Sequence, residues 1–194
     1  MKKLFTIIFL LNLILGNAHS MQADAFVQST VNRASEILSK NISKEEKTNG
    51  LKIIAKETVD IMGVGFYSLG SARKILNDKQ KRKYFELFED YFLKSFSSRL
   101  SEYTNPKIEV QSKKVINKNY TIVNSVLVST SDRPEVKIDW RIYTKNPDNP
   151  LIRDLIIEGL SLARTQKEEF ASILNSNDGD INALFKTLEN FTKN

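Results

Sequence analysis

The sequence predicts an α+β protein with a helical N-terminal part, an antiparallel sheet of four strands and C-terminal helices. Three observations predict this class. Apolar residues recur at helical spacing from residue 22 to about residue 103, alternate with polar residues over 108–158, and return to helical spacing after Gly159. Because the strands follow one another closely and short turns join them, we expect the sheet to be antiparallel.

The first twenty residues have the pattern of a secretory signal peptide. Met1-Lys2-Lys3 is a short basic start, residues 4–15 form an apolar run, and Ala18-His19-Ser20 places small residues at a cleavage point. A run of about twelve apolar residues is shorter than the roughly twenty that a membrane-spanning helix needs. We therefore expect residues 1–20 to be removed and residues 21–194 to form a single domain.

Composition excludes several classes of chemistry. The 194 residues include no cysteine and one histidine, which lies in the segment expected to be removed. A disulfide framework, a thiolate nucleophile and a cysteine–histidine zinc site are therefore excluded, and the mature chain would have no imidazole for acid–base catalysis. No cofactor is expected.

The charge of the chain gives little sign of a polyanionic partner. The full chain has a formal net charge of +6; removing Lys2 and Lys3 from its 29 basic residues leaves 27 against 23 acids, or +4. The basic residues are spread along the chain, and no stripe of arginines and aromatic residues of the kind that binds nucleic acid is present in the sequence. We expect no nucleic-acid partner.

Capping signals divide the helical region, residues 22–103. Ser43-Lys44-Glu45-Glu46 is a capping box, and Asn77 followed three residues later by Gln80 is a second helix start. Three glycines over 63–70 separate the helices that these signals open. Their spacing does not match a dinucleotide- or phosphate-binding loop, which also needs a preceding strand.

The helix expected from residue 78 to about residue 103 is unusually rich in aromatic residues. One stripe, with spacings of three, four, four and seven residues, consists of Phe85, Phe88, Phe92, Phe96 and Tyr103. A second stripe beside it consists of Tyr84, Leu87 and Tyr91. Together they form an apolar arc that is wider than a surface helix needs. The pattern alone favours a helix buried on most sides, and a helix that lines an apolar pocket is the second interpretation.

The strands begin after Asn105-Pro106, which ends the helix. Ile108 and Val110 point one way on the first strand. The clearest alternation sets Val136, Ile138, Trp140 and Ile142 against Lys137, Asp139, Arg141 and Tyr143. On the strand before it, one face is expected to carry Tyr120, Ile122, Val126 and Val128.

The sheet is expected to end with a fourth strand over residues 151–158 and with Gly159. Helices are then expected over 160–174 and from residue 181 to about residue 191, where apolar residues recur at helical spacing. A polar turn that contains Gly179 separates the two helices.

Candidate catalytic groups are few. The acids considered for a carboxylate pair are Asp139, Asp154 and Glu158, and Arg141, Arg153 and Arg164 lie close to them in the sequence. A structural cluster of ion pairs is the favoured interpretation. By elimination, the sequence favours binding over catalysis.

Several segments carry a resemblance through their order and spacing. They are Leu69-Gly70, residues 78–92, Ser98-Arg99-Leu100, the strand over 136–142, and, most specifically, residues 152–162, followed by Phe170 and Ile173-Leu174. They resemble the MlaC family, also called the toluene-tolerance family of periplasmic phospholipid-binding proteins. The resemblance runs from about residue 25 to about residue 190. Two positions depart from it: Arg73 stands where a tryptophan is usual, and Asp78 where a proline is usual.

The resemblance implies a soluble periplasmic shuttle without enzymatic activity, from a Gram-negative bacterium. It implies transport of a phospholipid between an outer-membrane lipoprotein complex and an inner-membrane ABC transporter complex with its substrate-binding subunit, which maintains the lipid asymmetry of the outer membrane. It also implies a strongly curved antiparallel sheet of the nuclear-transport-factor-2-like kind. The acyl chains would lie in an apolar cavity between this sheet and the helices, with the head group near solvent.

With this resemblance, lining of a pocket becomes the favoured role of the aromatic helix. The residues expected to bind lipid are Leu69, Phe88, Phe92 and Phe96 from the helices, with Val126, Val128, Ile138, Trp140 and Ile142 from the strands. The alternative is a secreted protein-interaction module with a closed core, which predicts a filled interior and no lipid. An enzyme on a similar fold would need a catalytic constellation that we do not find in the sequence.

Overall fold

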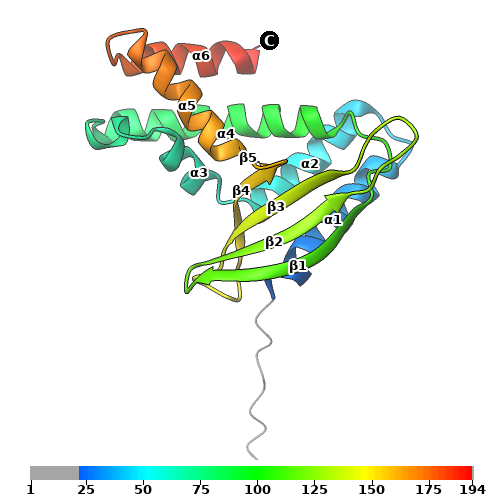
Figure 1. Ribbon diagram of the computed structural model, residues 1–194. Helices are drawn as coiled ribbons and strands as arrows, with labels where there is room; N and C mark the ends of the chain where they lie inside the picture. Colours follow the sequence, from blue (N-terminus) through cyan, green and yellow to red (C-terminus); the bar gives the residue numbers. More distant parts are fainter. Residues whose placement is uncertain (1–21, 194) are drawn as a thin grey trace, which may run out of the picture.

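The computed structural model describes residues 22–193, and the expected signal peptide, residues 1–20, lies outside them. The helices are α1 (Ala23–Ser39), α2 (Lys44–Thr58), α3 (Ile61–Ser68), the short 3-10 helix η1 (Ala72–Lys74), α4 (Asp78–Leu100), α5 (Leu162–Asn175) and α6 (Ile181–Lys193). The strands are β1 (Ile108–Asn117), β2 (Tyr120–Leu127), β3 (Val136–Tyr143), β4 (Leu151–Ile157) and β5 (Leu160–Ser161). The order of helices, strands and helices confirms the α+β class (Figure 1).

The strands form one antiparallel sheet in the order β1-β2-β3-β4-β5, as the short connections predict. The sheet has one strand more than expected, because Leu160 and Ser161 pair with the end of β4 before α5 begins. The turn between β4 and β5 is made by Glu158 and Gly159, both with positive φ. Ser161 then caps α5, since its Oγ accepts a hydrogen bond from the backbone N–H of Arg164 at 3.1 Å.

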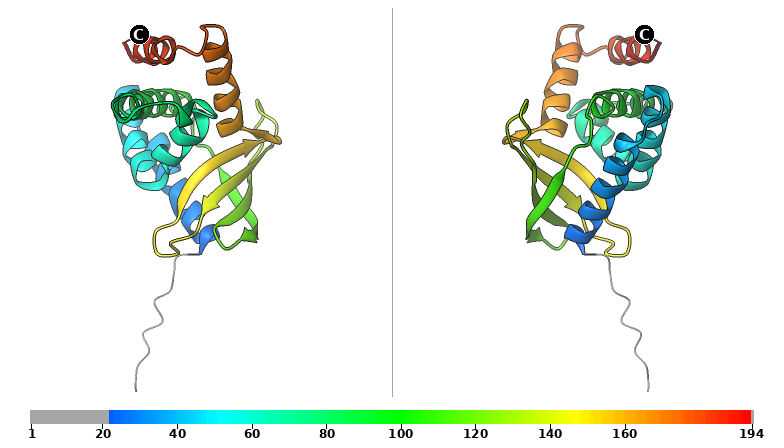
Figure 2. Two further views of the ribbon diagram at one scale, coloured as in Figure 1. Left: turned by 90° about the vertical axis from the view of Figure 1, so that its left-hand side faces the viewer. Right: turned by 90° about the vertical axis from the view of Figure 1, so that its right-hand side faces the viewer.

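The sheet is curved, and helices α1 to α4 lie to one side of it (Figure 2). Register shifts interrupt the pairing of β1 with β2 at two places and the pairing of β3 with β4 between Arg141 and Ile142. Irregularities of this kind bend a strand and increase its twist. The curved sheet thus partly surrounds the space that α1, α2 and α4 face.

Both predicted capping boxes are present. At the start of α2, the backbone N–H of Glu46 donates to Ser43 Oγ at 3.1 Å, and that of Ser43 donates to a Glu46 carboxylate oxygen at 2.9 Å. At the start of α4, Asn77 and Gln80 form the same reciprocal pair at 2.9 and 3.0 Å. These bonds satisfy N–H groups that have no partner inside the helix, so they fix where α4, the aromatic helix, begins.

A close approach between α3 and α4 anchors the aromatic helix. A Cβ atom at Gly65 would lie 2.7 Å from the ring of Phe88, so only glycine allows this packing. The hydroxyl of Tyr84 donates to the carbonyl oxygen of Gly65 at 3.0 Å. One of the glycines over 63–70, Gly65, is therefore needed for the packing of α3 against α4. Within the described residues, none of the helices combines the length and the apolar character that crossing a membrane requires.

Candidate functional site

An apolar cavity of about 340 Å³ lies between the inner face of the sheet and helices α1, α2, α4 and α5. The side chains that form most of its wall are large and apolar, and they include Val31, Leu38, Leu51, Ile54, Phe88, Phe92, Phe96, Leu127, Ile138, Trp140 and Ile152. The cavity is more than twice the ~150 Å³ of an engineered apolar cavity that binds benzene. It also lies within the size range of known ligand pockets.

The size of this cavity argues against a simple packing defect. At about 24 cal/mol per Å³, an empty space of this volume would cost up to about 8 kcal/mol. The whole stability of a domain is about 5–15 kcal/mol. A closed core predicts a filled interior, and the cavity does not fit that alternative.

Five of the nine residues expected to bind lipid line this cavity, namely Phe88, Phe92, Phe96, Ile138 and Trp140. The aromatic stripe of α4 and the inner face of β3 therefore meet across one space. Leu69 and Ile142 are instead buried in the core outside the cavity wall, with 3% and 0% of their surfaces exposed. Val126 and Val128 do not line the cavity either.

The register of the sheet explains the position of Val126. It pairs with Lys137 of β3, so it shares the outer face with the charged side chains of that strand. Leu127, one residue further along β2, lies on the inner face and lines the cavity. A shift of one residue along a strand exchanges the two faces, and β2 has apolar residues on both. Alternation alone could not identify its inner face.

Other parts of the wall come from α1, α2 and β4. Val31 and Leu38 recur at helical spacing in the sequence, as do Leu51 and Ile54, and all four line the cavity. This helical spacing of apolar residues is the sequence feature from which these parts of the wall could have been identified. Arg73, a departure from the family pattern, lies with its guanidinium 5.1 Å from the ring centroid of the exposed Phe66 and does not line the cavity.

Several polar groups of the wall are hydrogen-bonded to the protein itself. The hydroxyls of Thr30 and Thr58 donate to carbonyl oxygens of their own helices at 2.9 and 2.8 Å. The indole N–H of Trp140 donates to Ser125 Oγ at 2.8 Å, and that hydroxyl donates to the backbone carbonyl of Ile138 at 3.1 Å. The wall therefore presents mostly carbon to whatever occupies the cavity.

A hydrogen bond between α4 and α5 joins two further lining residues. The hydroxyl of Tyr91 donates to the side-chain oxygen of Gln166 at 2.9 Å. Burial, with a smaller contribution from the negative charge of Glu169, raises the pKa of Tyr91 above its ordinary value. The phenol therefore stays neutral and keeps donating at physiological pH.

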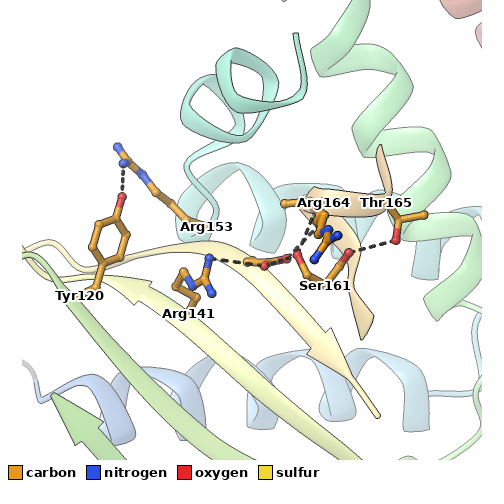
Figure 3. A network of polar contacts seen from close by, with 8 residues as sticks. Tyr120, Arg141, Arg153, Ser161, Arg164 and Thr165 are labelled. Atoms are coloured by element: carbon orange, nitrogen blue, oxygen red, sulfur yellow. Dashed lines mark hydrogen bonds and ion pairs between the residues drawn. The ribbon is translucent and has the colours of Figure 1, made fainter. Parts of the chain in front are cut away.

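The candidate carboxylate pair is not assembled. Asp154 is buried and accepts hydrogen bonds from Ser161 Oγ at 2.6 Å and the backbone N–H of Ala163 at 3.0 Å, with Arg141 at 3.9 Å (Figure 3). Asp139 instead accepts a bond from the side-chain amide of Asn124 at 2.7 Å. Glu158 accepts a bond from a backbone N–H of β3. The three acids therefore have separate structural roles.

Arg153 pairs with an acid that sequence proximity did not indicate. Its guanidinium contacts Asp60, the cap of α3, at 2.7 and 2.6 Å. It also donates to the hydroxyl of Tyr120 at 2.7 Å, as Figure 3 shows. The pair joins β4 to α3, which supports the structural interpretation of the ion pairs. Within residues 22–193, no three or more metal-ligating side chains are grouped closely enough to hold a metal ion.

Comparisons with known proteins agree with this architecture. A search of curated proteins found no match. A solved structure of the phospholipid-binding protein from Ralstonia solanacearum, in complex with a phospholipid, is similar with a TM-score of 0.75. The similarity covers 89% of this chain and 97% of that one at 17% sequence identity, which establishes a shared fold.

The family comparison extends this likeness to the sequence. The family described as MlaC protein matches residues 28–190, which is nearly the whole of the described chain. The match includes all of α4, the sheet and α5, the elements that build most of the cavity wall. The chain belongs to the MlaC family.

Proposed function

We propose that this protein binds a phospholipid and carries it through the periplasm with the acyl chains in the apolar cavity. The observation that carries the proposal is the cavity itself: about 340 Å³ of space with a wall of aromatic and aliphatic side chains. Membership of the MlaC family and the bound phospholipid in the Ralstonia solanacearum protein support it.

Elementary energetics favour an acyl chain as the occupant. Burial of one methylene contributes about 0.8 kcal/mol, so two chains of about sixteen carbons could contribute about 20 kcal/mol gross before ordering costs. The hydroxyls of Thr30, Thr58 and Tyr91 in the wall are already bonded to the protein, so they do not require a polar partner from the guest. We propose that Phe88, Phe92, Phe96, Ile138 and Trp140 contact the chains, with Leu69 and Ile142 supporting the wall from behind.

The proposed transport role places the protein between two membranes. It would exchange lipid with an outer-membrane lipoprotein complex and with an inner-membrane ABC transporter complex and its substrate-binding subunit, thereby maintaining outer-membrane lipid asymmetry. The signal-peptide pattern of residues 1–20 supports export to the periplasm, with residues 21–194 as the single binding domain. We propose binding without turnover, because the acids considered for catalysis have separate structural partners.

Native mass spectrometry of protein purified without detergent tests the proposal, followed by organic extraction and analysis of the lipids. We expect a mass excess equal to one phospholipid. A lipid-free mass would be followed by incubation with phospholipid vesicles, because cargo can be lost during purification. A mass that stays unchanged after incubation would overturn the proposal in favour of an interaction module.

A further inference from the structure

A second pocket, open to solvent, adjoins the apolar cavity at the C-terminal end of α4. Arg99 and Tyr103 line both spaces, so the two meet at these side chains. The remaining lining residues of the second pocket are polar or charged, namely Glu102, Thr104, Thr130, Asp132 and Arg133. An apolar space and a polar one thus adjoin at these two side chains.

The polar pocket is built from two segments that are about thirty residues apart in the sequence. Arg99 lies in the last turn of α4. Arg133 lies in the β2–β3 connection, where the backbone N–H of Thr130 donates to the carbonyl oxygen of Arg133 at 2.8 Å. The guanidinium of Arg133 lies 5.1 Å from the centroid of the Tyr103 ring. This turn and this ring hold Arg133 in the wall of the polar pocket, against a ring that also lines the apolar cavity.

The hydrogen bonding of Arg133 is incomplete. Its Nε atom is the one buried side-chain nitrogen or oxygen within residues 22–193 that has no hydrogen-bond partner. None of the ion pairs formed within those residues involves Arg99 or Arg133. A buried donor without a partner is unfavourable, and guanidinium groups match the oxygens of a phosphate. Two such groups beside an apolar cavity provide the chemistry for a phosphate that is attached to acyl chains.

We infer that the polar pocket binds the head group of the carried phospholipid, with Arg99 and Arg133 donating to its phosphodiester. This inference rests on the proposed function and specifies the end of the cavity at which the head group lies. Asp132 and Glu102 line the same pocket; Glu102 pairs with Lys44 at 3.9 Å, whereas Asp132 forms no ion pair within residues 22–193 and can face an added cation. A head group with a cationic amine beyond its phosphate therefore suits the pocket better than one with a net negative charge.

Lipids that share the same acyl chains and differ in the head group distinguish the contribution of the head group to binding from that of the chains. Delipidated protein is incubated with vesicles that contain equal amounts of phosphatidylethanolamine, phosphatidylglycerol and diacylglycerol, all with oleoyl chains, and the bound lipid is extracted and quantified. We expect the wild-type chain to prefer phosphatidylethanolamine over diacylglycerol by about tenfold, as one or two charge-assisted hydrogen bonds predict. The double variant Arg99→Gln/Arg133→Gln is expected to lose this preference while still binding lipid.

Arg82→Gln is the matched control. Arg82 is an exposed arginine of α4 that lines neither space, so the variant changes the same charge on the same helix and should keep the wild-type preference. Asp132→Asn is expected to move the selection towards phosphatidylglycerol, because it removes a negative charge beside the head group. Inorganic phosphate at millimolar concentration is expected to leave the bound lipid in place, since the acyl chains keep the head group at the arginines.

The outcomes distinguish this inference from the proposed function. A wild-type chain that takes up none of the three lipids would refute lipid binding itself. Uptake with equal preference for phosphatidylethanolamine and diacylglycerol, or an unchanged preference in the double arginine variant, would overturn only the head-group site. Displacement of the lipid by inorganic phosphate would instead identify a site for a soluble anion.

Discussion

The indole Nε1 of Trp140 donates a hydrogen bond to Ser125 Oγ at 2.8 Å, from β3 to the neighbouring strand β2. The bond satisfies the polar atom of the indole, and the ring lies in the wall of the apolar cavity. Trp140 is also the only tryptophan of the chain, and 7% of its surface is exposed. Its fluorescence therefore reports on the cavity alone.

Phospholipids with brominated acyl chains are expected to quench the fluorescence of Trp140, because bromine quenches an indole at short range. Emission is recorded while delipidated protein is titrated with vesicles that contain the brominated lipid. The control is Trp140→Phe/Val115→Trp, which moves the tryptophan to a residue of β1 that is 70% exposed. Equal quenching of the two proteins would contradict a chain-binding site at Trp140.

Phe92→Asp is expected to abolish lipid uptake, because a carboxylate in the wall would have to be buried beside an acyl chain without a partner. Phe92 is half-buried and lines the cavity, so the free protein should still fold. Val128→Asp introduces the same charge at a half-buried position outside the cavity wall and should keep the bound lipid. The lipid content of both purified proteins is measured after organic extraction. Equal lipid contents would refute the assignment of Phe92 to the wall of the lipid-binding cavity.

The contrast between Phe92 and Val128 shows what periodicity can and cannot predict. The spacing of the aromatic residues on α4 placed Phe88, Phe92 and Phe96 on one face, because a helix with a clear cap has a single period to follow. On β2, apolar residues occupy both faces, and only the pairing with β3 shows that Leu127 faces inward. Register depends on the partner strand, which alternation within one strand does not describe.

The polar pocket was harder still to foresee. Arg99 and Arg133 lie in different elements, and no periodic pattern connects the end of α4 with the β2–β3 turn. The sheet brings that turn close to the C-terminal end of α4, where residues of both segments line the polar pocket. In the same way, Arg153 pairs with Asp60, and the acids near Arg153 in the sequence bind other groups. Long-range pairs of this kind follow from the tertiary fold.

Gly65→Ala is expected to destabilise the protein by about 1–3 kcal/mol, because the new Cβ would lie 2.7 Å from the Phe88 ring and force it towards the cavity. Less space should remain for lipid. Gly50→Ala provides the contrast: there the Cβ would meet the end of the flexible Ile37 side chain, and removing a helical glycine contributes about 0.5–1 kcal/mol. Urea unfolding of both variants measures the difference. A similar stability of the two would show that α3 and α4 can separate easily.

Stability is expected to fall at alkaline pH through Tyr84. Burial, helped by the neighbouring Tyr91, raises the pKa of Tyr84 in the folded protein, whereas an unfolded tyrosine ionises near pH 10. The contribution of the neutral Tyr84 to the free energy of unfolding is therefore complete below pH 10. It is lost progressively as the pH rises above 10, because the tyrosine of the unfolded chain releases its proton first. Tyr84→Phe should have a shallower decline between pH 10 and pH 11 in urea midpoints. A decline as steep as that of the wild type would assign the loss to other groups.

Asp154→Ala is expected to cost about 2–4 kcal/mol, because it leaves the buried N–H of Ala163 and the hydroxyl of Ser161 without their acceptor. Asp139→Ala, which removes a half-buried carboxylate from the outer face of the sheet, should cost about 1 kcal/mol or less. Ala163 lines the cavity at the start of α5, so the loss at Asp154 also loosens the cavity wall. Urea unfolding should therefore rank Asp154→Ala below Asp139→Ala, and exchange of bound lipid with vesicles should be faster in Asp154→Ala alone. Equal exchange rates in the two variants would show that the start of α5 does not control access to the cavity.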